Sequence, residues 1–127
     1  MSTRVFISFD YDHDVDLKTM LVGQSKNPDS PFEISDWSIK DASPSWRSEA
    51  RRRIKACNVV AVLCGTQTAS ATGVAAEVQI AQEENVPYFL LQGRPGQSAQ
   101  KPTSARPADK IYSWTWDNLE SLIGGAR

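Results

Sequence analysis

The chain has 127 residues, of which 40% are hydrophobic and 23% are charged. This composition is typical of a folded globular protein and excludes a disordered chain, and the length predicts a single domain over residues 1–127. The 14 basic and 15 acidic residues leave a net charge of −1. This balance argues against a nucleic-acid-binding module that relies on phosphate contacts, so we expect no nucleic-acid partner.

The cysteines and the apolar runs indicate a compartment. Cys57 and Cys64 lie in or beside an apolar segment, without a C-x-x-C pair or a nearby histidine, as expected of reduced thiols in a cytosolic protein. No apolar stretch approaches the ~20 residues of a membrane span, and the N-terminal segment is strand-like and unlike a signal peptide. We therefore expect a cytoplasmic protein without a membrane partner.

The first third of the chain predicts a strand, a helix and a second strand. Residues 4–9 (RVFISF) are apolar and β-rich, which favours a buried strand. Residues 14–24 carry apolar side chains at roughly helical spacing, and Asp12 or Asp14 can cap this helix. A turn-forming NPDSP segment then precedes a weak strand over residues 32–35.

The middle of the chain predicts two more helices and the strongest strand. Residues 43–56 predict a helix with Ser43 as its N-cap and Pro44 at its first position. The continuous β-branched run NVVAVLC, residues 58–64, predicts a buried strand. The small residues of ATGVAAEVQIAQ, residues 71–82, predict a further helix.

The last part of the chain predicts another buried strand over residues 87–92 and an irregular, Pro-, Gly- and Ser-rich loop over residues 93–110. An edge strand over 111–114 and a short helix over 115–123, capped by Thr115, follow. Apolar strands that alternate with helices predict an α/β fold with a parallel sheet covered on both faces. In such folds, ligands bind at the carboxyl ends of the strands, where the winding direction switches.

Several enzyme classes lack the residues they need. No G-x-G-x-x-G, G-x-x-x-x-G-K-[ST] or G-x-S-x-G pattern occurs. We interpret the single histidine, His13 in DYDHD, as a solvated residue at a helix entry, and we expect no metal and no cofactor. Asp10, Asp12 and Asp14 crowd the end of the first strand, as in a phosphoacceptor receiver domain. A receiver also needs an aspartate at the end of the third strand, where this chain has a Cys-Gly pair.

Glu77 is the unusual residue of the helix over residues 71–82. At about 100° per residue, it projects among apolar neighbours such as Val74 and Ile80 and away from the polar side, where a carboxylate costs stability unless something compensates it. The bond between nicotinamide and ribose in NAD has a cationic leaving group, so its cleavage needs no general acid. A lone carboxylate can stabilise the oxocarbenium-like transition state of this reaction.

Aromatic and basic residues fall near the same predicted edge of the sheet. Aromatic rings can stack on the planar rings of a nucleotide, and basic side chains can meet its phosphates. The candidates for stacking are Phe9, Tyr11, Trp37 and Trp46, and those for phosphates are Lys40, Arg47 and Arg51.

Taken in order, the segments RVFISFDYDHD, FEISDWSI, IKACNVVAVLCG and VAAEVQIA resemble TIR domains, and among them the TIR-like group of the Thoeris antiphage ThsB type. The resemblance spans about residues 4–92. It implies a flavodoxin-like three-layer sandwich with a parallel five-stranded sheet in the order 2-1-3-4-5. It also implies cleavage of NAD, as substrate, to ADP-ribose or to a cyclic or related signalling nucleotide. Self-association, and an effector protein that responds to the product, are further implications.

The resemblance assigns roles to particular residues. The catalytic glutamate of the family lies in a V-x-x-E-[IV]-x-x-A pattern on the helix after the third strand, which implies that Glu77 is catalytic. The family patterns after the first and second strands imply six substrate-binding residues, which are Ser8, Phe9, Asp10, Asp36, Trp37 and Ser38. One departure is Gly73, because the family usually has a tryptophan four residues before the glutamate.

Each of these roles has a structural alternative. Glu77 can pair with an arginine, Asp10 can cap the first helix, and Asp36 can hold a turn. Trp46 can be a core residue, and the RRR run over residues 51–53 is typical of a solvated helix face. For the whole protein, the alternatives are a non-catalytic TIR-like interaction module, which the missing tryptophan favours, and a flavodoxin-like receiver or nucleotide-binding domain.

Overall fold

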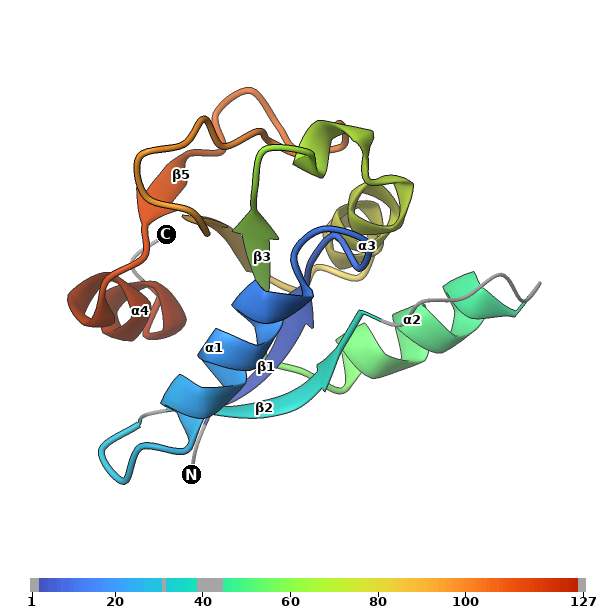
Figure 1. The fold of residues 1–127 in the computed structure, drawn as a ribbon. Helices are drawn as coiled ribbons and strands as arrows, with labels where there is room; N and C mark the ends of the chain where they lie inside the picture. Colours follow the sequence, from blue (N-terminus) through green and yellow to red (C-terminus); the bar gives the residue numbers. More distant parts are fainter. Residues whose placement is uncertain (1–2, 31, 39–44, 126–127) are drawn as a thin grey trace.

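The computed structural model describes residues 3–30, 32–38 and 45–125, and these form five strands, four α-helices and one 3₁₀ helix (Figure 1). In chain order the elements are β1 (Thr3–Ser8), α1 (Val15–Ser25), β2 (Phe32–Trp37), α2 (Trp46–Lys55), β3 (Val59–Cys64), η1 (Thr68–Ser70), α3 (Thr72–Glu83), β4 (Tyr88–Gln92), β5 (Ile111–Ser113) and α4 (Trp116–Ile123).

The strands form one sheet in the order β2-β1-β3-β4-β5, and every neighbouring pair is parallel. This confirms the predicted flavodoxin-like α/β sandwich. The strand predicted over residues 32–35 is longer, because it continues to Trp37. The helix predicted over residues 43–56 is described from Trp46 onward, and Ser43 and Pro44 lie outside the described residues.

The two faces of the sheet are covered by different helix pairs, as Figure 1 shows. Successive side chains of a strand point to opposite faces. In β3 the odd-numbered residues pack in one apolar cluster with Leu17 of α1 and Leu119 of α4. The even-numbered residues pack in a second cluster with Ile54 of α2 and Val78 of α3. The near-continuous burial of β3 follows from this double cover.

The same alternation decides where the end of β1 points. Val5 and Ile7 belong to the cluster beneath α1 and α4, whereas Phe6 belongs to the cluster beneath α2 and α3. Ser8 is two residues beyond Phe6, so its hydroxyl faces the α2–α3 side of the sheet. A polar side chain in an apolar strand is therefore aimed at α3.

The pairing of β1 with β2 contains an irregularity. Val5 pairs with Ile34 and the next residue of β1, Phe6, pairs with Asp36, so Ser35 is an extra residue in β2. Beyond this bulge, the amide of Ser38 donates a hydrogen bond to the carbonyl of Ile7 (2.9 Å). Ser38 is thereby held over the end of β1.

Residues 93–110 contain no helix or strand, as predicted, but they are tied to α3. Ser104 Oγ donates to the carbonyl of Ala75 (2.6 Å), and Gln82 Nε2 donates to the carbonyl of Ser104 (3.0 Å). At the C-terminal helix, the predicted cap is confirmed, because Thr115 Oγ1 accepts from the amide of Asn118 (3.1 Å). The loop therefore braces the helix that carries Glu77.

Two further features of the described residues are the state of the cysteines and the lengths of the helices. Cys57 and Cys64 are buried and neither forms a disulfide. Within the described ranges, the helices are too short or too polar to cross a membrane.

Candidate active site

A pocket of about 780 Å³ opens at the carboxyl end of β1. Its size is in the range of small-molecule sites. Its wall is built by the loop between β1 and α1, the residue after β2, the start of α2, and the segment from η1 into α3: Phe9, Asp10, Tyr11, Asp12, His13, Ser38, Trp46, Arg47, Ser70, Ala71, Thr72, Gly73, Val74, Ala76 and Glu77. In the order β2-β1-β3 the winding reverses next to β1, which is where ligands bind in open α/β sheets.

Glu77 lies in the second turn of α3 and is 1% exposed. Ser8 Oγ donates a hydrogen bond to Glu77 Oε1 (2.7 Å), and Ser38 Oγ donates to the same oxygen (2.5 Å). In the described part of the chain Glu77 forms no ion pair, so these data do not support the arginine-paired alternative. Because both hydroxyls bind Oε1, Oε2 is the oxygen left for a ligand in the pocket.

Burial raises the pKa of Glu77 from the ordinary value of 4.5 to about 7. A charged carboxylate is disfavoured where water is excluded, and the bonds from Ser38 and Ser8 counteract this only in part. Near neutral pH, the protonated and ionised forms of Glu77 therefore have similar populations. A cation in the pocket would shift this balance toward the carboxylate.

Ser38 connects the two strands at the pocket. Its hydroxyl also accepts a hydrogen bond from the amide of Phe9 (3.1 Å) and lies 3.4 Å from the carbonyl of Ile7. A hydroxyl has one proton, and the much shorter contact to Glu77 is the one that this proton serves. Ser38 thus binds the end of β1 through its acceptor and Glu77 through its donor.

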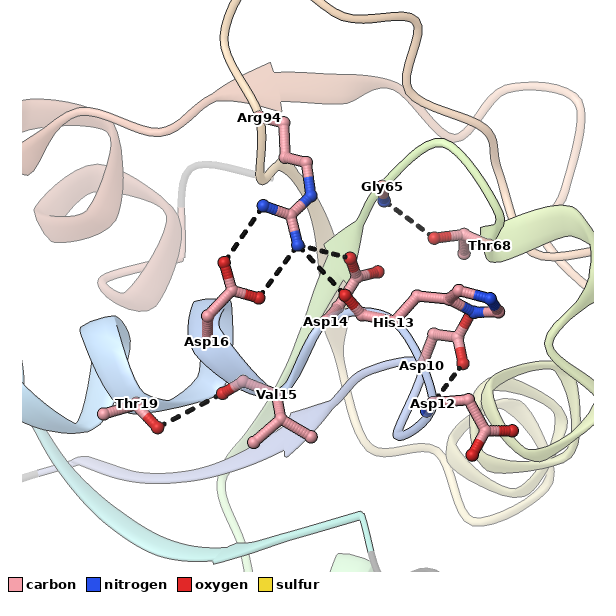
Figure 2. Close-up of polar contacts among 10 residues, drawn as sticks. All are labelled: Asp10, Asp12, His13, Asp14, Val15, Asp16, Thr19, Gly65, Thr68 and Arg94. Carbon is pink, nitrogen blue, oxygen red and sulfur yellow. Dashed lines mark hydrogen bonds and ion pairs between the residues drawn. The ribbon is translucent and has the colours of Figure 1, made fainter.

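Asp10 orders the loop that forms the near wall of the pocket (Figure 2). Its Oδ1 accepts from the amide of Asp12 (3.1 Å), and its Oδ2 lies 2.6 Å from Nδ1 of His13. Asp14, not Asp10, occupies the N-cap position of α1, and its side chain makes no capping bond. The structure therefore places Asp10 in the pocket wall rather than at the cap.

His13 and Arg94 are the residues that sequence reasoning missed. The His13 side chain is 51% exposed, as its position in an acidic turn predicted, but it also lines the pocket, which the sequence did not predict. Arg94 lies at the start of the loop over residues 93–110 and reaches back to the other end of the chain. An aspartate three residues before a histidine is a weak signal for such a pair, and no local signal marks Arg94.

Arg94 fastens the entry of α1 (Figure 2). It donates to the side chains of Asp14 (3.1 Å) and Asp16 (2.8 and 3.0 Å). Burial raises the pKa of Asp14, and Arg94 opposes this shift. Gly65 leaves room for the carboxylate, because a Cβ at this position would lie 2.6 Å from Asp14 Oδ2.

Aromatic rings cover part of the pocket wall. Phe9 and Tyr11 are stacked with ring centroids 5.4 Å apart. Gly73 stands where the family usually has a tryptophan, and a Cβ built on it would lie 3.7 Å from Cζ2 of Trp46. Since both residues line the pocket, Trp46 of α2 supplies an indole beside Gly73. Trp46 therefore contributes to the pocket wall, and it belongs to neither of the two apolar clusters of the described residues.

The remaining candidates are Asp36 and Trp37, which follow from the family pattern, and three basic residues that were candidates for phosphate binding. Asp36 and Trp37 lie outside the pocket lining: Asp36 accepts from Arg53 Nη1 (2.9 Å), and Lys18 Nζ lies 4.7 Å from the centroid of a Trp37 ring. Of the basic candidates, Arg47 lines the pocket and Arg51 pairs with Glu83, the last residue of α3, and with Glu84, which follows it. Lys40 lies outside the described residues.

Residues 6–94 are similar to a known protein family. A family model described as "Thoeris protein ThsB, TIR-like domain" matches this range. Curated protein sequences provide no match. Among solved structures, the chain is similar to the glutaminase domain of CTPS from Trypanosoma brucei with bound acivicin, with a TM-score of 0.47 and 20% identity. The similarity covers 72% of this chain and 37% of that one, and at this level it carries no argument about function.

Proposed function

Because the chain belongs to the family of TIR-like domains of the Thoeris protein ThsB, we propose that it is an enzyme that cleaves NAD between nicotinamide and ribose, with Glu77 as its catalytic carboxylate. The observation that carries this proposal is the position of Glu77. Its carboxyl group lines the pocket, is shielded from bulk water, and is fixed through one oxygen by two hydroxyls. A preorganised carboxylate of this kind acts on positive charge that develops in a transition state.

The chemistry fits a single carboxylate. As the bond from the ribose carbon to nicotinamide breaks, its electron pair neutralises the pyridinium ring, and positive charge appears on the ribose. The cationic substrate would favour the ionised form of Glu77, whose pKa of about 7 allows ionisation at neutral pH. In a water-poor site, the attraction between the carboxylate and the ribosyl cation is stronger than in water.

Other pocket residues suit the rest of a dinucleotide. The stacked rings of Phe9 and Tyr11 offer a surface for a base, and Arg47 at the start of α2 offers a charge for the pyrophosphate. Asp10 and Ser38 are proposed to line the nucleotide site, while Ser8 acts through Glu77. Asp36 and Trp37, which lie outside this wall, are not part of the proposal.

The product is proposed to be ADP-ribose or a cyclic or related nucleotide that activates an effector protein in antiphage defence. The proposal includes self-association of this domain and a cytoplasmic location. No cofactor takes part, because NAD is the substrate.

The test is release of nicotinamide from NAD by the purified protein at high concentration, followed by chromatography. We expect Glu77→Gln to lower the rate by about 100-fold or more, as when a transition-state contact is lost. Glu83→Gln is the matched control, because it changes an exposed glutamate on the same helix. Equal release by the wild type and Glu77→Gln would remove Glu77 from the reaction.

The non-catalytic interaction module remains the competing hypothesis. The absence of a tryptophan at position 73 supports it, whereas the indole of Trp46, which lines the pocket beside this position, weakens that support. The module predicts no nicotinamide release in any oligomeric state. It also predicts partner binding that survives Glu77→Gln.

A further inference from the structure

The loop between β1 and α1 places an imidazole in the wall of the pocket. Nδ1 of His13 lies 2.6 Å from Oδ2 of Asp10, whose carboxylate is buried while the His13 side chain is 51% exposed. A carboxylate that binds one ring nitrogen fixes the tautomer and the orientation of the ring. With the proton on Nδ1, the second nitrogen, Nε2, has the lone pair and can accept a proton.

Both partners of this pair are held in place by further contacts (Figure 2). Oδ1 of Asp10 accepts from the amide of Asp12 (3.1 Å). The carbonyl of Asp10 accepts from the amides of His13 (3.2 Å) and Asp14 (2.8 Å). Arg94 Nη2 donates to the carbonyl of His13 (3.0 Å). A group fixed in this way loses little entropy when it acts on a bound substrate.

The pocket therefore contains two proton-binding groups in opposite environments. Glu77 is buried beneath two hydroxyls, whereas His13 stands at the open side with a carboxylate behind it. The other charged or titratable groups in the wall are Asp10, Tyr11 and Asp12 on the same loop and Arg47 on α2. Two groups in such different surroundings are suited to different steps of one reaction.

Resting on the function proposed above, we propose that His13, oriented by Asp10, is a second catalytic residue that removes the proton from the hydroxyl that captures the ribosyl cation. The bond from the ribose carbon to nicotinamide breaks first, and both electrons go to the pyridine nitrogen, so nicotinamide leaves neutral. The oxygen of water or of a second hydroxyl then forms a bond to this carbon. Its proton passes to Nε2 of His13 and from there to solvent, so one proton is released per turnover.

This division leaves each group one task. Glu77 Oε1 already accepts two hydroxyl bonds, and a carboxylate that stabilises the cation cannot at the same time be neutralised by a proton. An imidazole is the most common general base in enzymes, and Nε2 of His13 has the lone pair that this role needs. Asp10 is a positioning residue in this scheme, because it acts through His13.

The test compares two ways of capturing the same intermediate. Methanol or water must lose a proton, whereas 3-acetylpyridine attacks through a ring nitrogen that has no proton to lose. The wild type is incubated with NAD, methanol and 3-acetylpyridine. Mass spectrometry then measures the products formed when water or methanol captures the ribosyl cation, and the dinucleotide formed when 3-acetylpyridine replaces nicotinamide. The quantity compared between variants is the ratio of the first to the second. This ratio depends on proton removal and not on the amount of folded enzyme.

We expect His13→Gln to lower the ratio by about 100-fold, the scale of general-base catalysis. Asp10→Asn should lower it in the same direction, because the amide no longer favours the reactive tautomer. Glu77→Gln is the matched control: it lowers total turnover and leaves the ratio unchanged. An unchanged ratio in His13→Gln would overturn this inference alone, whereas a wild type that forms neither product would overturn the proposed function and this inference with it.

Discussion

The raised pKa of Glu77 leads to a prediction about the stability of the fold that does not depend on any substrate. The pKa of this carboxyl rises from 4.5 to about 7 on folding, so the folded protein binds more protons than the unfolded chain between these values. The free energy of unfolding must then fall as pH increases through this window. The difference corresponds to about 3 kcal/mol that the wild type loses by pH 8. Glu77→Gln has no proton to lose, and its amide oxygen can still accept from Ser8 and Ser38.

We therefore expect Glu77→Gln to match the wild type near pH 4.5 and to be more stable by about 3 kcal/mol at pH 8. Urea unfolding followed by circular dichroism at several pH values measures this difference. Glu33→Gln controls for replacing an exposed carboxyl by an amide. If the wild type and Glu77→Gln kept parallel pH profiles, Glu77 would not be a buried carboxyl confined by the two serines.

Two further predictions concern the entry of α1. Arg94→Gln leaves Asp14, which is 2% exposed, without its cation. We expect it to lower the free energy of unfolding at pH 7 by about 2 kcal/mol, measured by urea unfolding. A decrease no larger than that of the exposed control Arg106→Gln would contradict this. Gly65→Ala would place a Cβ 2.6 Å from Asp14 Oδ2 and should cost about 1–3 kcal/mol. Gly23→Ala is its control, because a Cβ there meets nothing within 4 Å, and it should be neutral or stabilising; equal melting temperatures for the two variants would refute the steric argument.

The fold was predictable because its signals are local. The continuous apolar run of β3 and the helical spacing in α3 each reflect packing against a layer that the rest of the sequence also specifies. Glu77 was predictable for the same reason, since its helical position put a carboxylate among apolar neighbours. The family pattern implied only that Ser8 binds substrate, and the alternation of side chains along β1 explains why Ser8 contacts Glu77.

The rest of the site depends on contacts that sequence spacing does not encode. Arg94 bonds to a carbonyl 81 residues earlier in the chain, and nothing in a Pro- and Gly-rich loop marks such a partner. Because of the bulge at Ser35, it is Ser38 and not Trp37 that contacts Glu77. The position of such an extra residue in an edge strand cannot be predicted from the amino-acid composition of the strand. The sequence predicted that His13 is exposed, but it carries no signal that this exposed ring also borders a pocket.

The proximity of Gly73 and Trp46 means that one volume of the pocket wall is shared by two helices. A Cβ at position 73 would lie 3.7 Å from Cζ2 of Trp46, so a larger side chain that extends in this direction would meet the indole. The two positions therefore face the same part of the pocket wall, and Trp46 already supplies an aromatic ring there.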